Sequence, residues 1–280
     1  MKVAIILPSA LSSIPKDTFY TFIYAYSYLL NRIDDLPFNI ERLEIKAPTQ
    51  FPIDANRNNA IAELIEDGFD ISLWLDLDQT FPSNTLFRLL NNDFPIVSGI
   101  YHLKTLFTYP IVFRRVEDDT DFTWFKPIVG YPRDDYFEAD MIGMGCVKIN
   151  VDVFRDIAAT YSKDEKIEFF RYGINPIRYD GQDDNKTPER IKAEKIRSKY
   201  LIRDVSEDVY FWKQVAEKTD YKIMIDPKIQ CGHLGSFEYT DQFFTSIFNS
   251  RMRTLKEENP EEYERIQESL CRIEKISSAS

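Results

Sequence analysis

Apolar side chains recur along the first hundred residues in two patterns, which predict strands and helices in alternation. The runs at 2–8 (KVAIILP), 71–75 (ISLWL) and 95–101 (PIVSGIY) are almost continuously apolar, as in strands that are buried on both faces. Residues 38–46 alternate between apolar and polar side chains, which indicates another strand. Residues 17–33 repeat apolar side chains at helical spacing, so a helix is expected there.

Two more helices are expected between these strands. The segment NRNNAIAELIEDG follows Pro52, with Asn56 as its expected N-cap and Gly68 as its C-terminal stop. A shorter helix, SNTLFRLLNND, begins at Ser83, whose hydroxyl can cap it. The order strand, helix, strand, helix, strand predicts an α/β fold with a mostly parallel, Rossmann-like sheet flanked by helices.

The second half of the chain mixes strands, helices and polar segments. A strand at 146–149 leads into a helix, and a helix at 206–218 begins at Ser206, a capping residue followed by two acids. A strand over 221–227 then precedes the glycine-flanked loop IQCGHLGS. The polar tract at 161–203 is too long for an ordinary connection, so it is either a lid or a disordered insertion.

Composition narrows the class of protein. The 280 residues are 44% hydrophobic and carry a net charge of −11, which disfavours a passive nucleic-acid binder because such proteins need cationic surface. No apolar run reaches the length of a membrane span, and the N-terminal segment fits a first strand better than a signal peptide. Three widely spaced cysteines fit a reducing cytoplasm, where the protein is expected to act.

The strongest chemical signal is a pair of aspartates, Asp76 and Asp78, directly after the apolar run at 71–75. Carboxylates at the end of a buried strand lie at the rim of the sheet, where open α/β sheets bind ligands. Carboxylate oxygens suit a hard divalent cation such as Mg²⁺ or Mn²⁺, which in turn neutralises phosphate. The pattern therefore indicates metal-assisted chemistry on a phosphorylated donor.

Four segments in one order extend this interpretation: NRNNAIAELIE, LWLDLDQTF, MIGMGCVKINVDVF and SEDVYFWKQVAEKTDYKIMIDPKIQCGHLGS. Together they resemble the GT-A glycosyltransferases with an Asp-X-Asp motif, and most closely the small single-domain members of bacteria and their viruses. The resemblance covers nearly the whole chain to about residue 240, and the order of the segments carries it more than any single motif. It implies a GT-A fold and transfer of a sugar from a nucleoside-diphosphate sugar to a hydroxyl.

The resemblance also implies roles for particular residues. The second aspartate and a later histidine would hold the cation, Mn²⁺ or Mg²⁺, which makes Asp78 and His233 the expected metal ligands. One carboxylate of the acidic pair Glu207 and Asp208 would deprotonate the acceptor hydroxyl or orient it. The expected donor contacts are Pro8, Ser9, Arg57, Asp76, Gly143 and Gly145.

The expected organisation is a catalytic domain over 1–240, followed by a C-terminal helical extension over 241–280. Within the domain, residues 1–101 would bind the nucleotide sugar, and residues 102–240 would contribute the acceptor and metal side. Four classes of acceptor are compatible with the sequence: a polysaccharide, a protein, a small molecule and modified DNA. A virus-encoded enzyme acting in the host cytoplasm is compatible with this resemblance.

Other functions remain as alternatives. DLDQT also fits a haloacid-dehalogenase-type phosphatase, in which Asp76 would be the nucleophile, Asp78 the acid/base and Ser98 the second motif. The aspartates follow the third strand rather than the first, which disfavours this interpretation. A nucleotidyltransferase needs a glycine-rich loop after the first strand, where this chain has LPSALSS. A non-catalytic carbohydrate-binding relative is disfavoured, because every residue expected to bind the metal or the donor is present in the sequence.

Overall fold

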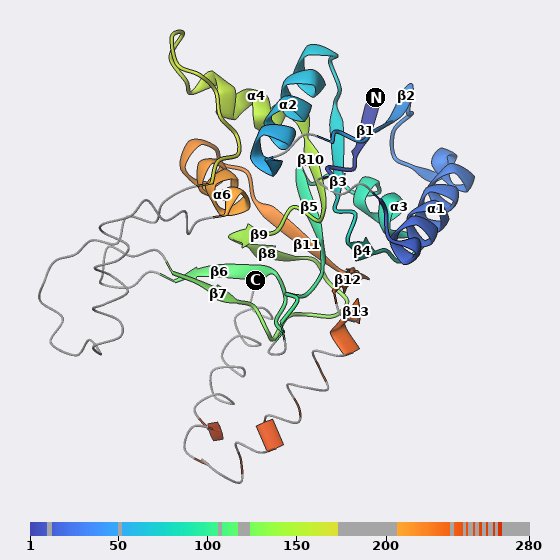
Figure 1. Ribbon diagram of the computed structural model, residues 1–280, viewed down its shortest axis with the longest axis vertical. Helices are drawn as coiled ribbons and strands as arrows, with labels where there is room; N and C mark the ends of the chain where they lie inside the picture. Colours follow the sequence, from blue (N-terminus) through green and yellow to red (C-terminus); the bar gives the residue numbers. More distant parts are fainter. Residues whose placement is uncertain are drawn as a thin grey trace, which may run out of the picture.

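A seven-stranded sheet forms the centre of the chain (Figure 1). The computed structural model describes residues 1–9, 13–49, 52–105, 108–116, 124–172, 206–235, 238–242 and single positions between 245 and 264. The strands lie in the order β2 (Arg42–Lys46), β1 (Lys2–Ile6), β3 (Ile71–Leu75), β10 (Cys146–Asn150), β5 (Ile96–Ile100), β11 (Ile223–Gln230) and β8 (Phe137–Ala139). Strands β1, β2 and β3 are parallel, as are β5 and β11.

Helices cover both faces of this sheet (Figure 1). One face carries α1 (Lys16–Asn31) and α3 (Thr85–Leu90), and the other carries α2 (Ile53–Glu66), α4 (Val151–Ala159) and α6 (Glu207–Lys218). A short 3₁₀ helix, Ile33–Asp35, follows α1. Side chains of β1 alternate between the two apolar clusters, as a strand buried on both faces requires.

Two three-stranded sheets adjoin the central one. The first joins β4 (Gln79–Thr80), β12 (Gly232–Leu234) and β13 (Glu238–Tyr239). The second joins β7 (Trp124–Pro127), β6 (Val112–Val116) and β9 (Met141–Ile142). The first of them extends the molecule beyond the carboxyl ends of two central strands, since β4 follows β3 and β12 follows β11.

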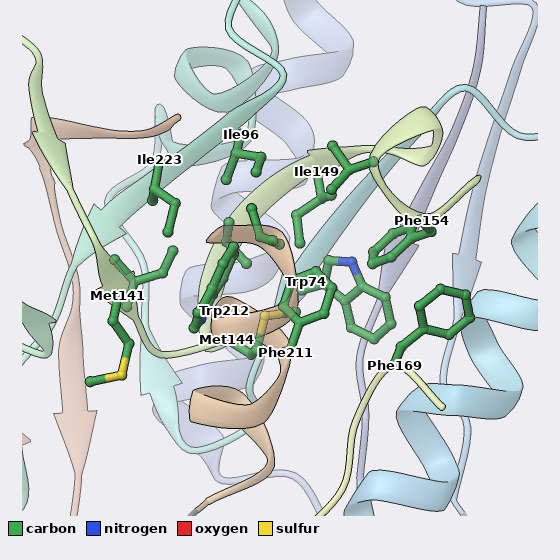
Figure 2. Close-up of a cluster of buried hydrophobic side chains, with 14 of the residues drawn as sticks. Trp74, Ile96, Met141, Met144, Ile149, Phe154, Phe169, Phe211, Trp212 and Ile223 are labelled. Carbon is green, nitrogen blue, oxygen red and sulfur yellow. The ribbon is translucent and has the colours of Figure 1, made fainter. Parts of the chain in front are cut away.

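The cluster of buried side chains beneath α4 and α6 is rich in aromatic rings (Figure 2). Phe211 of α6 stacks on Phe170 with 4.8 Å between ring centroids, and it lies 5.5 Å from Phe154 of α4. Trp74 of β3 packs on Phe154 and Phe170, and its indole N–H donates a hydrogen bond to the Ser72 hydroxyl at 2.9 Å. This packing fixes the first turns of α6 against the end of β3.

The predicted α/β fold, with a mostly parallel sheet flanked by helices, is confirmed. The pairing differs from the expectation of uninterrupted parallel strands in the first half. Strand β10 lies antiparallel between β3 and β5, so a strand from the second half of the chain separates two strands of the first. Its side chains Val147 and Ile149 are fully buried, and the sheet gains a strand whose amino end lies at the rim.

Several local predictions require correction. Helix α2 begins after Pro52, so Asn56 is not its N-cap but lies in the first turns, where its side chain donates to the Pro48 carbonyl at 2.8 Å. Helix α3 has Asn84, not Ser83, at its N-cap position. The expected stop at Gly68 is confirmed, because this residue has φ of 67°, a conformation that glycine adopts readily.

Parts of the remaining expectations fall outside the described residues. The tract at 161–203 is described only to residue 172, and the C-terminal extension is described only at scattered positions.

The expected loop around His233 is instead strand β12, preceded by a β11 that runs to Gln230. None of the helices in the described ranges combines the length and the apolar character that crossing a bilayer demands.

Replacing Phe211 with alanine should destabilise the protein by about 3–5 kcal/mol, because it leaves a cavity between α4 and α6 that neighbouring rings cannot fill. Urea unfolding followed by tryptophan fluorescence measures this loss. Phe19→Ala is the matched control, since Phe19 is 50% exposed on α1 and its loss should change stability by less than about 0.5 kcal/mol. Equal effects of the two variants would contradict the assigned core.

Candidate active site at the carboxyl edge of the sheet

The carboxyl ends of the parallel strands gather the predicted site residues at one rim. Register pairs Ile6 of β1 with Trp74 of β3, so Pro8 and Asp76 follow at the same level of the sheet. Strands β5 and β11 run in the same direction and lead to Tyr101 and His233. Crevices outside such strand ends are where open α/β sheets bind ligands.

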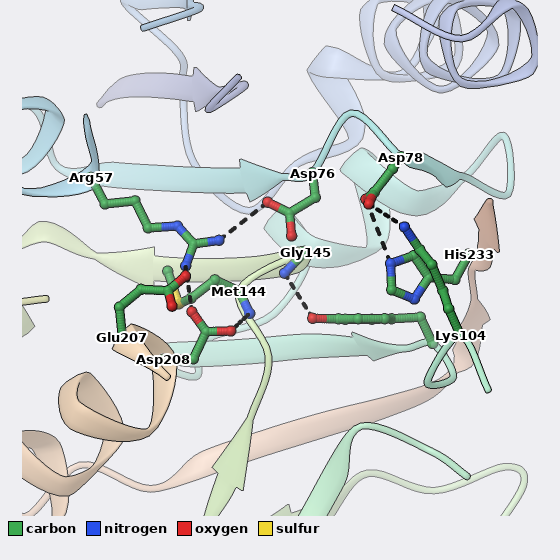
Figure 3. Close-up of polar contacts among 10 residues, drawn as sticks. Arg57, Asp76, Asp78, Lys104, Met144, Gly145, Glu207, Asp208 and His233 are labelled. Carbon is green, nitrogen blue, oxygen red and sulfur yellow. Dashed lines mark hydrogen bonds and ion pairs between the residues drawn. The ribbon is translucent and has the colours of Figure 1, made fainter. Parts of the chain in front are cut away.

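A single guanidinium, that of Arg57 on α2, lies among three carboxylates (Figure 3). Its Nη1 donates to Glu207 Oε1 at 2.7 Å and also to Asp208 Oδ1, and its Nη2 donates to Asp76 Oδ1 at 3.3 Å. The Arg57 side chain is only 4% exposed, and the ring of Phe170 lies beneath its guanidinium at 5.5 Å. Arg57 thus joins α2, the end of β3 and the start of α6.

Burial and charge shift the pKa values of these groups in opposite directions. Burial would lower the pKa of Arg57, but Asp208, Asp76 and Glu207 raise it, so the side chain is permanently charged. Burial raises the pKa of Asp208 to about 6, although Arg57 acts against this rise. Burial also raises the pKa of Asp76, with Arg57 again opposing and Asp78 adding to the rise. Asp208 is therefore a carboxylate that takes up a proton near pH 6.

The second aspartate, Asp78, contacts two different side chains. Its Oδ2 accepts a hydrogen bond from the Lys104 ammonium, and its Oδ1 lies 3.5 Å from His233 Nε2 (Figure 3). Burial acts to raise the pKa of Asp78, but His233 and Lys104 lower it to about 2. Asp78 is therefore ionised throughout the physiological range.

Backbone pairing explains why two residues far apart in sequence meet here. His233 of β12 pairs with Gln79 of β4, the residue directly after Asp78. The Leu234 N–H also donates to the Asp78 carbonyl at 2.7 Å. This small sheet holds the His233 ring beside the Asp78 carboxylate.

The His233 ring is oriented by a backbone contact on its other nitrogen. Its Nδ1 lies 2.7 Å from the carbonyl oxygen of His102, and because a carbonyl only accepts, Nδ1 carries a proton. The other ring nitrogen, Nε2, is then the one that faces Asp78 Oδ1, at 3.5 Å. Such an arrangement, with one nitrogen fixed by a carbonyl, is typical of histidines that bind metals.

The chemistry of Asp78 and His233 fits a divalent cation. Two atoms that each bind Mg²⁺ at roughly 2.0–2.1 Å can lie up to about 4.2 Å apart, and Asp78 Oδ1 and His233 Nε2 are 3.5 Å apart. No group of three or more His, Cys, Asp or Glu side chains that could hold a metal occurs in the part of the chain that the structure describes. Two protein ligands suffice for an ion that keeps waters and binds substrate phosphates.

The glycines before β10 permit close packing at the rim. The Gly145 carbonyl accepts a hydrogen bond from the Asp76 N–H at 3.0 Å, and its own N–H donates to the Tyr101 hydroxyl at 3.0 Å. A Cβ at Gly145 would lie 1.8 Å from Gln79 Nε2, and one at Gly143 would lie 1.9 Å from the Tyr101 hydroxyl oxygen. A side chain at either position would have to displace Gln79 or Tyr101.

The structure thus brings most of the predicted residues to one rim, in two connected groups. Arg57 gathers Asp76, Glu207 and Asp208, while Asp78 and His233 form the second group, and Gly145 contacts Asp76. Pro8 and Ser9 follow β1 at the same edge, where the Ser9 N–H donates to the Pro48 carbonyl at 3.0 Å. Their predicted roles toward a ligand stay predictions.

Two residues of the site, Tyr101 and Lys104, were not singled out from the sequence. Tyr101 is buried between the two groups and makes an edge contact with His233 at 5.3 Å between ring centroids. Tyr101 directly follows β5 and Lys104 lies four residues beyond its end, so their place at the end of a predicted parallel strand was a signal that could have identified them. His102, which lies between them, has a fully buried side chain and contributes its carbonyl to the site.

Comparisons with known proteins give only distant likenesses. No protein-family model matches the chain, and no curated protein matches it. Among solved structures, A197 from STIV is 16% identical with a TM-score of 0.43, over 84% of this chain and 86% of that one. GalNAc-T7 with UDP, GalNAc and Mn²⁺ is 8% identical with a TM-score of 0.41, over 84% of this chain but only 44% of that one.

A third similar structure is 4-diphosphocytidyl-2C-methyl-D-erythritol synthase from Anaerococcus prevotii, at 12% identity and a TM-score of 0.32, over 59% of this chain and 79% of that one. Because every one of these TM-scores is below 0.5, the likenesses do not establish a function for this chain. Its function is inferred instead from the side chains at the rim.

Replacing Arg57 with methionine should destabilise the protein by about 3–5 kcal/mol at pH 8, because three carboxylates lose their shared counterion. The loss should shrink at pH 5, where protonation relieves the repulsion between them. Chemical unfolding at both pH values measures the difference. Arg114→Met is the control, since Arg114 is 51% exposed, and a pH-independent loss for Arg57→Met would contradict the assigned network.

Proposed function

We propose that the chain is a metal-dependent glycosyltransferase that moves a sugar from a nucleoside-diphosphate sugar to an acceptor hydroxyl. The observation that supports this most is the imbalance of charge at the rim. Four carboxylates, of Asp76, Asp78, Glu207 and Asp208, face two cationic side chains, Arg57 and Lys104, and the imidazole of His233 among the described residues that contact them. A site with this excess of negative charge favours a divalent cation, and through it a diphosphate.

Asp78 and His233 would hold the cation, with Asp78 Oδ1 and His233 Nε2 as its protein ligands. When bound, a divalent cation stabilises the negative charge that grows on a departing diphosphate. Asp76 would contact the donor through Oδ2, because its Oδ1 is engaged by Arg57. Pro8 and Ser9 would border the nucleoside, and Gly143 and Gly145 would let the backbone approach the sugar.

Asp208 would be the base that accepts the proton of the acceptor hydroxyl. Its side chain is 22% exposed, against 10% for Glu207, so it is the more accessible member of the pair. Its raised pKa of about 6 makes it a stronger base than an ordinary carboxylate. Arg57 and the Met144 N–H, at 3.3 Å from Asp208 Oδ2, would fix its orientation. Arg57 is then a positioning residue rather than a direct donor contact.

The geometry weakens the phosphatase alternative. Ser98 is fully buried in β5, with its hydroxyl 2.8 Å from the Gly99 carbonyl and 3.0 Å from the Cys146 carbonyl. It lies within the sheet rather than at the rim, so it could not contact a phosphate on Asp76. The acidic pair and His233 would also have no part in that reaction.

The proposed function predicts that one nucleoside-diphosphate sugar stabilises the protein only when Mn²⁺ is present. A ligand that binds the folded state at 100 times its Kd adds about 2.7 kcal/mol of stability, which a thermal-shift screen of common donors detects. Asp78→Asn should abolish this shift and the transfer activity, while its melting temperature without ligand stays close to wild type. A full shift in the Asp78→Asn variant would overturn the assignment of the metal.

Activity should fall as the pH drops below about 6, because Asp208 acts as a base only when it is ionised and its pKa is raised to about 6. The pH profile of kcat/KM measures this acid limb. Asp208→Asn should reduce the rate by about 10²–10⁴-fold and remove the limb. Glu207→Gln serves as the comparison, and a profile that keeps its limb in Asp208→Asn would assign the base elsewhere.

A further inference from the structure

Lys104 is a cationic side chain at the rim to which neither sequence motif nor resemblance assigns a role. It lies in the turn that follows β5, where the Leu103 N–H donates to the Tyr109 carbonyl at 3.0 Å and the Thr108 hydroxyl donates to the Leu103 carbonyl at 2.6 Å. These contacts fix the backbone at Leu103, the residue before Lys104. The ammonium then reaches from it to Asp78 Oδ2 (Figure 3).

We propose that Lys104 binds the diphosphate of the donor, and that its contact with Asp78 is the resting position of a phosphate-binding side chain. This inference rests on the proposed function and extends it. The first support is the distribution of contacts around Asp78, whose Oδ1 faces His233 while its Oδ2 contacts Lys104. The ammonium therefore lies beside the position where Asp78 and His233 would share a cation.

The charges at the site explain why the Lys104–Asp78 contact would change when a divalent cation and a diphosphate bind. A divalent cation on Asp78, together with the Lys104 ammonium, leaves a local excess of two positive charges around one carboxylate. The repulsion between the two cations is relieved if the ammonium turns toward an anion next to the metal. A diphosphate is an anion of this kind, because it binds the same metal and presents further oxygens to a lysine.

The exposure of both side chains indicates that the Lys104–Asp78 ion pair can break, so that the ammonium binds another anion. The two side chains are 30% and 37% exposed, and ion pairs near the surface add little stability in water. A lysine ammonium is carried on a flexible four-carbon stem, so it can move between two oxygens without displacement of the backbone. The opposite holds for Arg57, which is 4% exposed and bound to three carboxylates, and which is therefore not available to a phosphate.

Binding measurements on the full chain test this role without relying on turnover. Three titrations are compared by calorimetry: Mn²⁺ alone, a panel of nucleoside diphosphates (UDP, GDP, ADP, CDP and dTDP) with Mn²⁺, and the corresponding nucleosides with Mn²⁺. The variants are Lys104→Met, which removes the charge at similar length, and Lys104→Arg, which retains it. Lys222→Met is the control, because Lys222 pairs with Glu138 at 2.9 Å on an exposed surface of the same chain.

The affinity of Lys104→Met for the nucleoside diphosphate should fall by about 10- to 100-fold, the usual loss for a hydrogen bond to a charged group. Its affinity for Mn²⁺ alone should stay the same or rise, because Asp78 loses a competing cation, and nucleoside affinity should not change. Lys104→Arg should recover most of the lost affinity, and Lys222→Met should match wild type.

Two results would overturn the role of Lys104 alone: unchanged diphosphate affinity in Lys104→Met, or a parallel loss of Mn²⁺ affinity, which would mean that Lys104 only positions Asp78. A wild-type protein that binds no nucleoside diphosphate of the panel would instead overturn the proposed function. The two failures are therefore distinguished by the wild-type titration.

Discussion

The arrangement of the rim depends on one buried guanidinium. Arg57 contacts carboxylates from the end of β3 and from the start of α6, so one side chain fixes the distance between two halves of the chain. Three carboxylates at this depth would repel one another and would be costly to remove from water without a counterion. Their proximity depends on Arg57, which also opposes the rise that burial causes in the pKa of Asp208.

The residues at the rim form two groups, one around Arg57 and one around Asp78, which differ in burial. Residues that contact Arg57 are largely buried and held in place by the aromatic packing of Phe170 and Phe211. The residues around Asp78 are more exposed and are held by short backbone pairings between β4 and β12. The first group has the properties of a fixed framework, and the second those of a site that exchanges ligands.

Much of this fold can be predicted from the sequence because its signals are local. Apolar runs mark β1, β3 and β5, and Gly68 marks the end of α2, since each depends on neighbouring residues. The antiparallel insertion of β10 could not be predicted in this way. A strand that is apolar on both faces fits beside several partners, and its place depends on pairing with residues about 75 positions away.

In the site, too, some features have local sequence signals and others depend on residues far apart in the sequence. Asp76 and Asp78 are visible as carboxylates after a strand, and their place at the rim follows from the parallel sheet. The role of Arg57 as a shared counterion is not visible, because an arginine on a helix is usually solvated and its partners Glu207 and Asp208 lie 150 residues further along. The place of Lys104 after a predicted strand is visible, but its contact with Asp78 is not, since it depends on the turn after β5.

The position of β11 has a consequence for a chain that is still being synthesised. Strand β5 pairs on one side with β10 and on the other with β11, which ends at Gln230. Until that strand leaves the ribosome, β5 has an open edge, and Arg57 lacks two of its three carboxylates until α6 has been made. The nascent protein therefore carries an unpaired strand edge, the kind of partly formed surface that chaperones recognise.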